Sequence, residues 1–205
     1  MSQQSHFMEM NDMYLYGAGG HASVIIDILK ANNIEVRAVI DDNPLLTSID
    51  GLPVICPSLN ISPLIISIGD NSIRKAIAEK YDVEYGKAIH PSAIIAETVN
   101  VGVGSVIMHG AIIQAHSNIG KHCIINTKAS IDHHCVIEDY CHIAPSATIC
   151  GNVHISSGAF IGAGAIIIQG IKIGRQAIVG AGAVVTTDVP DNSTVVGIPA
   201  KPIMK

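Results

Sequence analysis

Isoleucine or valine recurs at every sixth residue through the second half of the chain. The series starts Ile89, Ile95, Val101, Ile107 and continues without a break to Val185. When each hexad is numbered from this branched residue, position 5 is also restricted and is nearly always small. A period of six fits neither the 3.6-residue helix nor a simple hairpin array. It fits short strands that are separated by tight corners.

Three hexads close a triangular coil, so this pattern predicts a left-handed parallel β-helix. The branched residue would fill the inside of each flat face, and the small residue at position 5 would fit where the chain turns. Coils would stack at roughly 4.7–4.9 Å, with residues 18 apart in the sequence lying one above the other. Segment 89–190 is therefore expected to form one β-helix of nearly six coils. A generic β-sandwich is disfavoured, because it needs alternation and irregular loops.

The first 85 residues lack the hexad and alternate short apolar runs with helical patterns. We expect strands at 14–16, 36–40 and 64–68 and helices near 23–31 and 72–80. Such alternation predicts a small parallel sheet. The expected fold class is thus mixed: a Rossmann-like α/β half domain at 13–85, a linker near 85–91, the β-helix at 89–190 and a tail at 191–205.

A glycine-rich turn follows the first expected strand. It contains Gly17, Gly19, Gly20 and His21, and Asp41 comes about 20 residues later. Such a turn presents backbone N–H groups and a helix N-terminus to phosphate, while a carboxylate meets a ribose hydroxyl. NAD is one candidate ligand, but the domain holds only one mononucleotide-sized half, so the UDP or GDP of a sugar nucleotide fits better. The alternative is a turn that serves only to pack helix on strand.

Composition excludes several classes of protein. A formal net charge of −5 leaves no basic surface for nucleic acid or anionic lipid. No apolar run approaches the roughly 18 residues that span a bilayer, so membrane insertion is not expected. The N-terminal residues show neither the charged nor the apolar region of a secretory signal. Five cysteines then suggest reduced, packed thiols, and we expect a cytoplasmic protein.

Several motifs occur together along the chain. They are 14–21, 40–42, 67–74, 90–91, 126–127, 131–137, 142–147, 150–152 and 197–201. Their combination, over residues 13 to about 203, resembles the bacterial hexapeptide acetyltransferases that modify sugar nucleotides. That group includes N-acetyltransferases of 4-amino-sugar nucleotides and relatives that O-acetylate sialic acid. The resemblance implies acetyl-CoA as co-substrate, a homotrimer with active sites between adjacent subunits, and a role in making bacterial surface glycans.

The resemblance also assigns roles to individual residues. The catalytic base falls on His133. The family usually places an acid directly after the base, but this chain has His134 there, and His134 is kept among the catalytic candidates. Asp132, Glu138, Asp139, a residue of the adjacent subunit or a backbone carbonyl would orient the imidazole instead. Substrate contacts fall on Gly17, Gly19, Gly20, His21, Asp41, Asp42, Gly69, Asn71 and Asn126. Contacts to acetyl-CoA fall on His142, Gly151, Ala163 and Ala181, and the tail at 197–201 would cover part of the coenzyme or simply cap the last coil.

The hexad spacing itself gives His133 a plausible environment. His133 occupies position 3, off the inward rows, so its side chain should project outward. Its neighbours one coil away are Ala115 and Gly151, which leave room beside the imidazole. Histidine suits proton transfer near neutral pH, and the bare Gly151 N–H can approach a thioester closely. The alternative is an exposed histidine with no function.

We therefore expect an N-acetyltransferase that acts on the amino group of a nucleotide-linked deoxyamino sugar. Two alternatives stay open: an O-acetyltransferase of a sugar hydroxyl such as sialic acid, and a non-enzymatic sugar-nucleotide-binding β-helix. The ten histidines also suggest a metal enzyme as an alternative. His116 should stack on His134, and the same stretch of the chain also contains His109, His122 and His133. No two β-helix histidines have the His-x4-His spacing of β-helical carbonic anhydrases, so we expect no metal.

Overall fold

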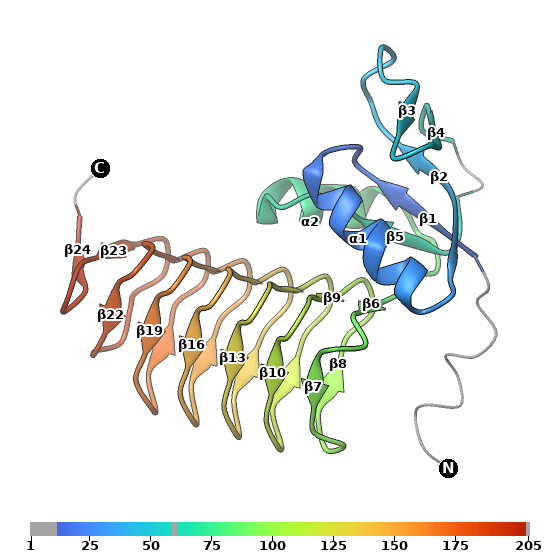
Figure 1. Cartoon of the computed structure of the whole chain (residues 1–205). Helices are drawn as coiled ribbons and strands as arrows, with labels where there is room; N and C mark the ends of the chain where they lie inside the picture. The colour runs from blue at the N-terminus through green and yellow to red at the C-terminus, as the bar shows by residue number, and fades with distance from the viewer. Residues whose placement is uncertain (1–11, 59–60, 204–205) are drawn as a thin grey trace.

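The computed structural model describes residues 12–58 and 61–203. The expectation that no export signal is present rests almost wholly on residues 1–11, which lie outside the described ranges. Figure 1 shows an α/β part beside one end of a long coil of short strands. No helix within the described ranges has both the length and the apolar character that crossing a membrane requires.

The α/β part contains one five-stranded sheet in the order β3-β4-β2-β1-β5. Its strands are β1 (Asp12–Tyr16), β2 (Glu35–Ile40), β3 (Ser48–Ile49), β4 (Leu52–Ile55) and β5 (Leu64–Ile66), and its helices are α1 (Gly20–Ala31) and α2 (Asn71–Lys80). The pairs of β1 with β2, β1 with β5 and β2 with β4 are parallel, as expected. The antiparallel β3–β4 hairpin was not predicted, because strands this short and this exposed carry little pattern.

Beside the glycine-rich turn, the start of α1 and the end of β5 differ from the prediction. Helix α1 begins at Gly20, three residues before the expected start, because the extended Gly19 acts as its N-cap. Strand β5 ends at Ile66 rather than at 68. The chain leaves the sheet at Ser67, whose hydroxyl donates to the carbonyls of Tyr16 and Gly17. Both deviations lie beside the glycine-rich turn and shape it.

The C-terminal part is a β-helix with three faces, which confirms the fold predicted from the hexad. The first face holds β7 (Ile94–Ile95), β10 (Ile112–Ile113), β13 (Ser130–Ile131), β16 (Thr148–Ile149), β19 (Ile166–Ile167) and β22 (Val184–Val185). The second face holds β8 (Asn100–Val101), β11 (Asn118–Ile119), β14 (Val136–Ile137), β17 (His154–Ile155) and β20 (Lys172–Ile173). The third face holds β6 (Ala88–Ile89), β9 (Val106–Ile107), β12 (Ile124–Ile125), β15 (His142–Ile143), β18 (Phe160–Ile161), β21 (Ile178–Val179), β23 (Thr194–Val196) and β24 (Lys201–Pro202).

Residues 18 apart pair in parallel on every face, as the spacing predicts. On the first face, for example, Ile113 pairs with Ile131 and Ile131 pairs with Ile149. The branched residues and the position-5 residues together form one continuous core. Cys123, Cys135 and Cys141 belong to this core and are free thiols.

The structure corrects the assignment of the corner. The chain turns at position 4, not at position 5, and every position-4 residue from Gly104 to Gly182 has a positive φ angle. Examples are His116 at 61°, His134 at 57° and Gly164 at 65°. A left-handed residue at each corner lets the chain turn sharply, and the next residue can then point into the interior. Position 5 is small because it is packed inside the prism.

The α/β part lies on the third face. Apolar residues of α1 and β1 share one core with Ala88, Val106, Met108 and Ile124 of the β-helix. The segment expected as a linker, 85–91, contains β6, the first strand of that face. At the other end the chain adds β23 to the third face and folds back as β24, antiparallel to β23. The tail thereby covers the last coil, which would otherwise expose an open strand edge.

Candidate active site

His133 lies at the corner between the first and second faces and is exposed. Gly151 lies at the same corner one coil further on. A β-carbon built on Gly151 would be 2.6 Å from His133 Cε1 and 2.9 Å from Nε2, so a side chain there would displace the imidazole from its present position. The Gly151 N–H donates to no acceptor in the described part of the chain. The corner therefore presents an imidazole beside an unused backbone donor, as the hexad spacing predicts.

His134 is the residue that contacts the His133 ring. The two Nδ1 atoms are 3.1 Å apart, and the rings meet edge to face. His134 in turn packs against His116, one coil below, with ring centroids 5.0 Å apart. A hydrogen bond between two Nδ1 atoms needs one donor and one acceptor. If His133 donates, its Nε2 keeps the lone pair that a base requires, so His134 takes the place of the usual acid as a neutral acceptor.

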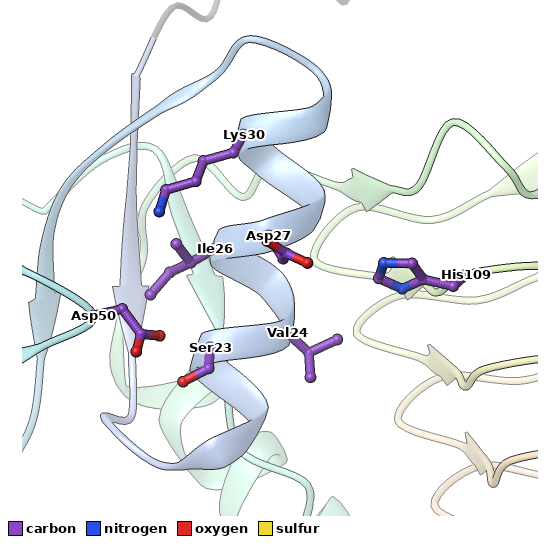
Figure 2. A pocket seen from close by; sticks show the side chains of 7 residues that line it. All are labelled: Ser23, Val24, Ile26, Asp27, Lys30, Asp50 and His109. Atoms are coloured by element: carbon purple, nitrogen blue, oxygen red, sulfur yellow. The ribbon is translucent and has the colours of Figure 1, made fainter.

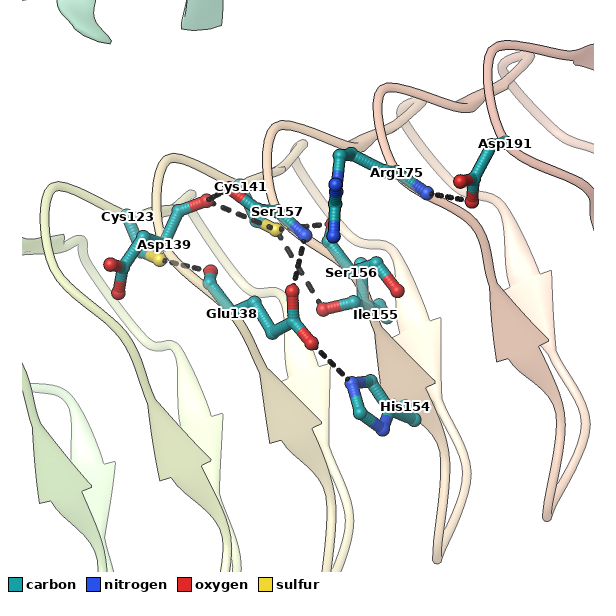
Figure 3. A network of polar contacts seen from close by, with 10 residues as sticks. All are labelled: Cys123, Glu138, Asp139, Cys141, His154, Ile155, Ser156, Ser157, Arg175 and Asp191. Carbon is teal, nitrogen blue, oxygen red and sulfur yellow. Dashed lines mark hydrogen bonds and ion pairs between the residues drawn. The ribbon is translucent and has the colours of Figure 1, made fainter.

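None of the three acidic candidates contacts the His133 ring within one chain. Asp139 Oδ1 accepts the Lys121 N–H at 2.7 Å. Asp132 Oδ1 accepts the backbone N–H of His133 at 2.8 Å, so it fixes the turn. Glu138 accepts from His154 Nε2 at 2.7 Å and from the Ser157 N–H at 2.9 Å, as Figure 3 shows. The hydrogen bond from His154 is the main cause that lowers the pKa of Glu138. Glu138 therefore joins two coils at another corner.

The glycine-rich turn connects β1 to α1. Gly17 has φ +107°, and a β-carbon there would lie 2.6 Å from the Ile68 side chain, so glycine is required on both counts. Around Gly19 and Gly20, by contrast, an added β-carbon would meet nothing within 4 Å. The first turn of α1 is thus open at its N-terminus, where backbone N–H groups and the helix dipole favour an anion.

Asp41 and Asp42 both make contacts within the α/β part. The Asp41 carboxylate accepts the Ala18 N–H at 2.8 Å and the Asn43 N–H at 2.9 Å. Asp42 accepts from the Tyr16 hydroxyl at 2.9 Å. Asp41 therefore holds the glycine-rich turn in place from the end of β2. Its expected contact with a nucleotide stays a prediction.

His142 points outward from the third face toward the α/β part. Its Nδ1 donates to the Gly69 carbonyl at 3.3 Å, and its Nε2 accepts from the Asn126 side-chain amide at 3.2 Å. Burial, with the nearby Arg74 cation, lowers the pKa of His142 to about 4. Burial likewise lowers the pKa of His21 to about 4, and His21 Nε2 is buried with no hydrogen-bond partner among the described residues. Both imidazoles are therefore neutral at physiological pH.

The predicted site residues fall into separate groups in a single chain. The expected substrate contacts Gly69, Asn71 and Asn126 gather with His142 at the third face. His133 and Gly151 lie at the opposite corner, between the other two faces. The remaining expected acetyl-CoA contacts, Ala163 and Ala181, are exposed at the corner between the third and first faces, 18 residues apart.

Two hollows border the α/β part. One, of about 450 Å³, runs from the start of α2 along the third face and includes Gly69 and Asn71 in its lining. The other, of about 520 Å³, lies between α1 and the β-helix, with His109 facing the helix (Figure 2). This second pocket is lined by Ser23, Val24, Ile26, Asp27, Lys30, Asp50 and His109, none of which was predicted as a site residue.

The histidines raised for a metal site are dispersed. His109 stacks on His90 with ring centroids 3.7 Å apart, and the His122 ring lies between Tyr85 and Tyr140. His116 and His133 lie at yet another corner. Within 12–58 and 61–203, no three His, Cys, Asp or Glu residues are grouped so that they could hold a metal ion.

The sequence reasoning missed Arg74. Arg74 is 1% exposed as a whole residue, and its guanidinium hydrogen-bonds to both parts of the molecule. A signal was present in the sequence: Arg74 falls on the same face of α2 as the buried Ile77, three residues on. A cation on the apolar face of a helix is rarely buried without a specific set of partners.

Comparison with known families gives two matches. The family model described as PglD N-terminal domain matches residues 12–81. The model described as bacterial transferase hexapeptide (six repeats) matches residues 116–151 and 152–187. Among curated proteins, an uncharacterized protein of Acanthamoeba polyphaga mimivirus is 35% identical over 89 residues, and the matched region is 40% of this chain but only 18% of that protein.

Solved structures match over nearly the whole chain. A variant of perosamine N-acetyltransferase from Caulobacter crescentus, solved with CoA and GDP-perosamine, is 37% identical with a TM-score of 0.91, covering 95% of this chain and 97% of that one. The acetyltransferase domain of PglB from Neisseria gonorrhoeae, in complex with acetyl coenzyme A, is 33% identical with a TM-score of 0.87, covering 94% and 99%. WeeI from Acinetobacter baumannii is 31% identical with a TM-score of 0.87, covering 94% and 100%.

Proposed function

This chain belongs to the sugar acetyltransferases that join a PglD-type N-terminal domain to hexapeptide repeats, and we propose that it acetylates the amino group of a nucleotide-linked amino sugar. Acetyl-CoA is the acetyl donor. The observation that carries the proposal is the His133 imidazole held beside the unused N–H of Gly151. Amine attack on a thioester needs a proton acceptor and a donor to the carbonyl oxygen, and this corner offers both.

In the proposed reaction the sugar amine attacks the thioester carbon. The Gly151 N–H stabilises the negative charge that develops on the carbonyl oxygen. His133 Nε2 takes the amine proton, while its Nδ1–H stays bonded to His134. When the tetrahedral intermediate collapses, the carbon–sulfur bond breaks and the departing thiolate can receive that proton. The products are the N-acetyl sugar nucleotide and CoA.

The α/β part would hold the nucleotide. The open N-terminus of α1 at Gly19 and Gly20 suits the diphosphate, with His21, Asp41 and Asp42 beside it. Gly69, Asn71 and Asn126 would contact the sugar at the third face. A GDP sugar is the first candidate, since GDP-perosamine is bound by the Caulobacter relative, and UDP sugars are the second.

The separation of the site residues supports a trimer with shared active sites. In one chain the third face and the His133 corner point in different directions, so a substrate on the α/β part cannot reach its own His133. A second copy whose His133 corner approaches the third face would complete the site. His142, Gly151, Ala163 and Ala181 would then line the acetyl-CoA cleft between subunits. We further propose that the enzyme acts in the cytoplasm.

The test is the turnover of His133→Ala with saturating acetyl-CoA and a panel of GDP- and UDP-linked amino sugars. We expect kcat to fall about 10²-fold or more, the usual cost of losing a general base. His109→Ala is the matched control, because His109 occupies the same hexad position at another corner. A wild-type kcat in His133→Ala would reject the assigned role. Product masses from a parallel panel of hydroxyl-only sugars would reveal O-acetylation. The lack of an acid on the His133 ring within the chain disfavours that reaction, because a hydroxyl needs stronger activation than an amine.

A further inference from the structure

Helix α2 covers a corner where the β-helix exposes unpaired carbonyl groups. At the corner between the second and third faces, position 4 is occupied by His122, Tyr140 and Gly158 on three successive coils. Within the described ranges, none of these three carbonyls accepts a backbone hydrogen bond. Such groups are satisfied by water when exposed, but they cost free energy when another element covers them without donors. The covering helix must therefore supply hydrogen bonds.

Arg74 and Asn71 supply them. Arg74 Nε donates to the His122 carbonyl at 2.8 Å, and Nη2 donates to the Tyr140 carbonyl at 3.0 Å. The Asn71 side-chain amide donates to the Gly158 carbonyl at 3.0 Å. The first turn of α2 is thus hydrogen-bonded to three consecutive coils: Arg74 bonds the first two, and Asn71 bonds the third.

The same guanidinium holds the loop that precedes α2. Its Nη1 donates to the Ile68 carbonyl at 2.9 Å and to the Gly69 carbonyl at 3.1 Å, and Nη2 donates to Asn71 Oδ1 at 2.7 Å. The Gly69 carbonyl also accepts from His142. One buried side chain therefore links the loop, the helix and the coils.

The arrangement is specific to an arginine. Burial lowers the pKa of Arg74 to about 10, which still leaves it charged at neutral pH. Arg74 forms no ion pair with any residue in 12–58 or 61–203. Its planar fork instead directs several N–H donors at carbonyl oxygens, which lysine cannot do. The guanidinium fixes positions rather than neutralising an acid.

We propose that Arg74 is a positioning residue for sugar acetylation. It fixes the position of the 69–71 loop along the axis of the β-helix. This inference rests on the proposed function. The loop is expected to contact the sugar, whereas the His133 and Gly151 that complete its site in the proposed trimer belong to particular coils of a neighbouring subunit. A nucleotide sugar can present its amine to those coils only if the loop is held at the matching level, and a misplacement of about 1 Å can cost about 10²-fold in rate.

The experiment compares Arg74→Ala and Arg74→Lys with wild type. We expect kcat/KM for the nucleotide amino sugar to fall about 10²-fold in both, while the affinity for acetyl-CoA, measured by calorimetry, stays at the wild-type value. Millimolar guanidinium chloride should restore part of the turnover of Arg74→Ala, because the ion can occupy the space left by the side chain, and should leave Arg74→Lys impaired. Lys75→Ala, the exposed neighbour on α2, is the control for a surface change.

Two results would overturn the inference. One is wild-type kcat/KM for the sugar in both variants. The other is an equal loss of acetyl-CoA affinity and sugar turnover, not relieved by guanidinium, in Arg74→Ala and also in Arg74→Gln, which would mean a general folding defect. Arg74→Gln keeps two side-chain donors, so the inference predicts that this variant folds and shows the selective sugar defect. A wild-type enzyme that binds acetyl-CoA but acetylates no amino-sugar nucleotide would instead reject the proposed function.

Discussion

At the residue scale, the candidate site depends on which ring nitrogen of each imidazole carries the proton. His133 can act as a base only if it donates through Nδ1, and the neighbouring His134 is free to accept. His142 must be neutral at Nε2, because that atom accepts from the Asn126 amide while Nδ1 donates to a carbonyl. In both cases the partner decides which nitrogen carries the proton.

This protonation pattern predicts a loss of stability in acid. Burial lowers the pKa of His21, His122 and His142 from 6.5 to about 4 in the folded protein, so the unfolded chain binds more protons between these values. The contribution of these neutral histidines to the free energy of unfolding is complete above about pH 6.5. It is lost as the pH falls toward 4, by an amount on the order of 1–3 kcal/mol per group. Urea unfolding at pH 7 and pH 4.5 measures it.

His142→Gln is the matched variant for this measurement. Glutamine can keep a donor and an acceptor at the third face but does not titrate. We expect the free energy of unfolding of His142→Gln to depend less on pH than that of wild type. An unchanged pH dependence would show that His142 is not the neutral, buried group described above.

At the scale of the elements, each corner of the β-helix from Gly104 to Gly182 turns on one left-handed residue. The sequence uses glycine at some of these positions, such as Gly164 and Gly182, and longer side chains at others, such as Lys128 and Gln176. A left-handed residue with a β-carbon costs about 1–2 kcal/mol relative to its usual conformation. The corners are therefore not equivalent in backbone strain, although their geometry repeats.

Substitutions at two corners should have opposite effects. At Gly164, φ is +65° and an added β-carbon would meet nothing within 4 Å, so Gly164→Ala is expected to destabilise by about 1 kcal/mol through the backbone alone. Lys128 is exposed with φ 57°, so Lys128→Gly should stabilise by up to about 1 kcal/mol. Urea unfolding tests both, and a neutral Gly164→Ala would contradict the assigned cost.

At the scale of the whole molecule, the α/β part and the His133 corner are on different sides of the prism. The hydrogen bonds of Arg74 and Asn71 and the shared apolar core hold the α/β part on the third face. Within a single chain the predicted substrate-binding residues and the proposed base therefore face different directions. The proposed trimer follows from this separation.

Mixed trimers test the shared site. His133→Ala and Asn126→Ala chains should each be inactive as homotrimers, yet refolding them together in equal amounts should restore about a quarter of the wild-type sites, because each site draws the two residues from different chains. A mixture of His133→Ala with Gly151→Val is the control and should stay inactive, since both changes lie at one corner. No recovery in the first mixture would place the whole site in one chain.

The sequence by itself determined the β-helix and which residues are neighbours across its coils. Residues 18 apart must stack once the hexad closes a coil, so the contact between His133 and Gly151 could be predicted without any structure. Only the tertiary structure decided that His134 rather than an acid contacts His133, that Glu138 holds His154, and that Arg74 joins the two parts. These contacts depend on side-chain reach and on unpaired carbonyls at one corner, and neither leaves a periodic trace in the sequence.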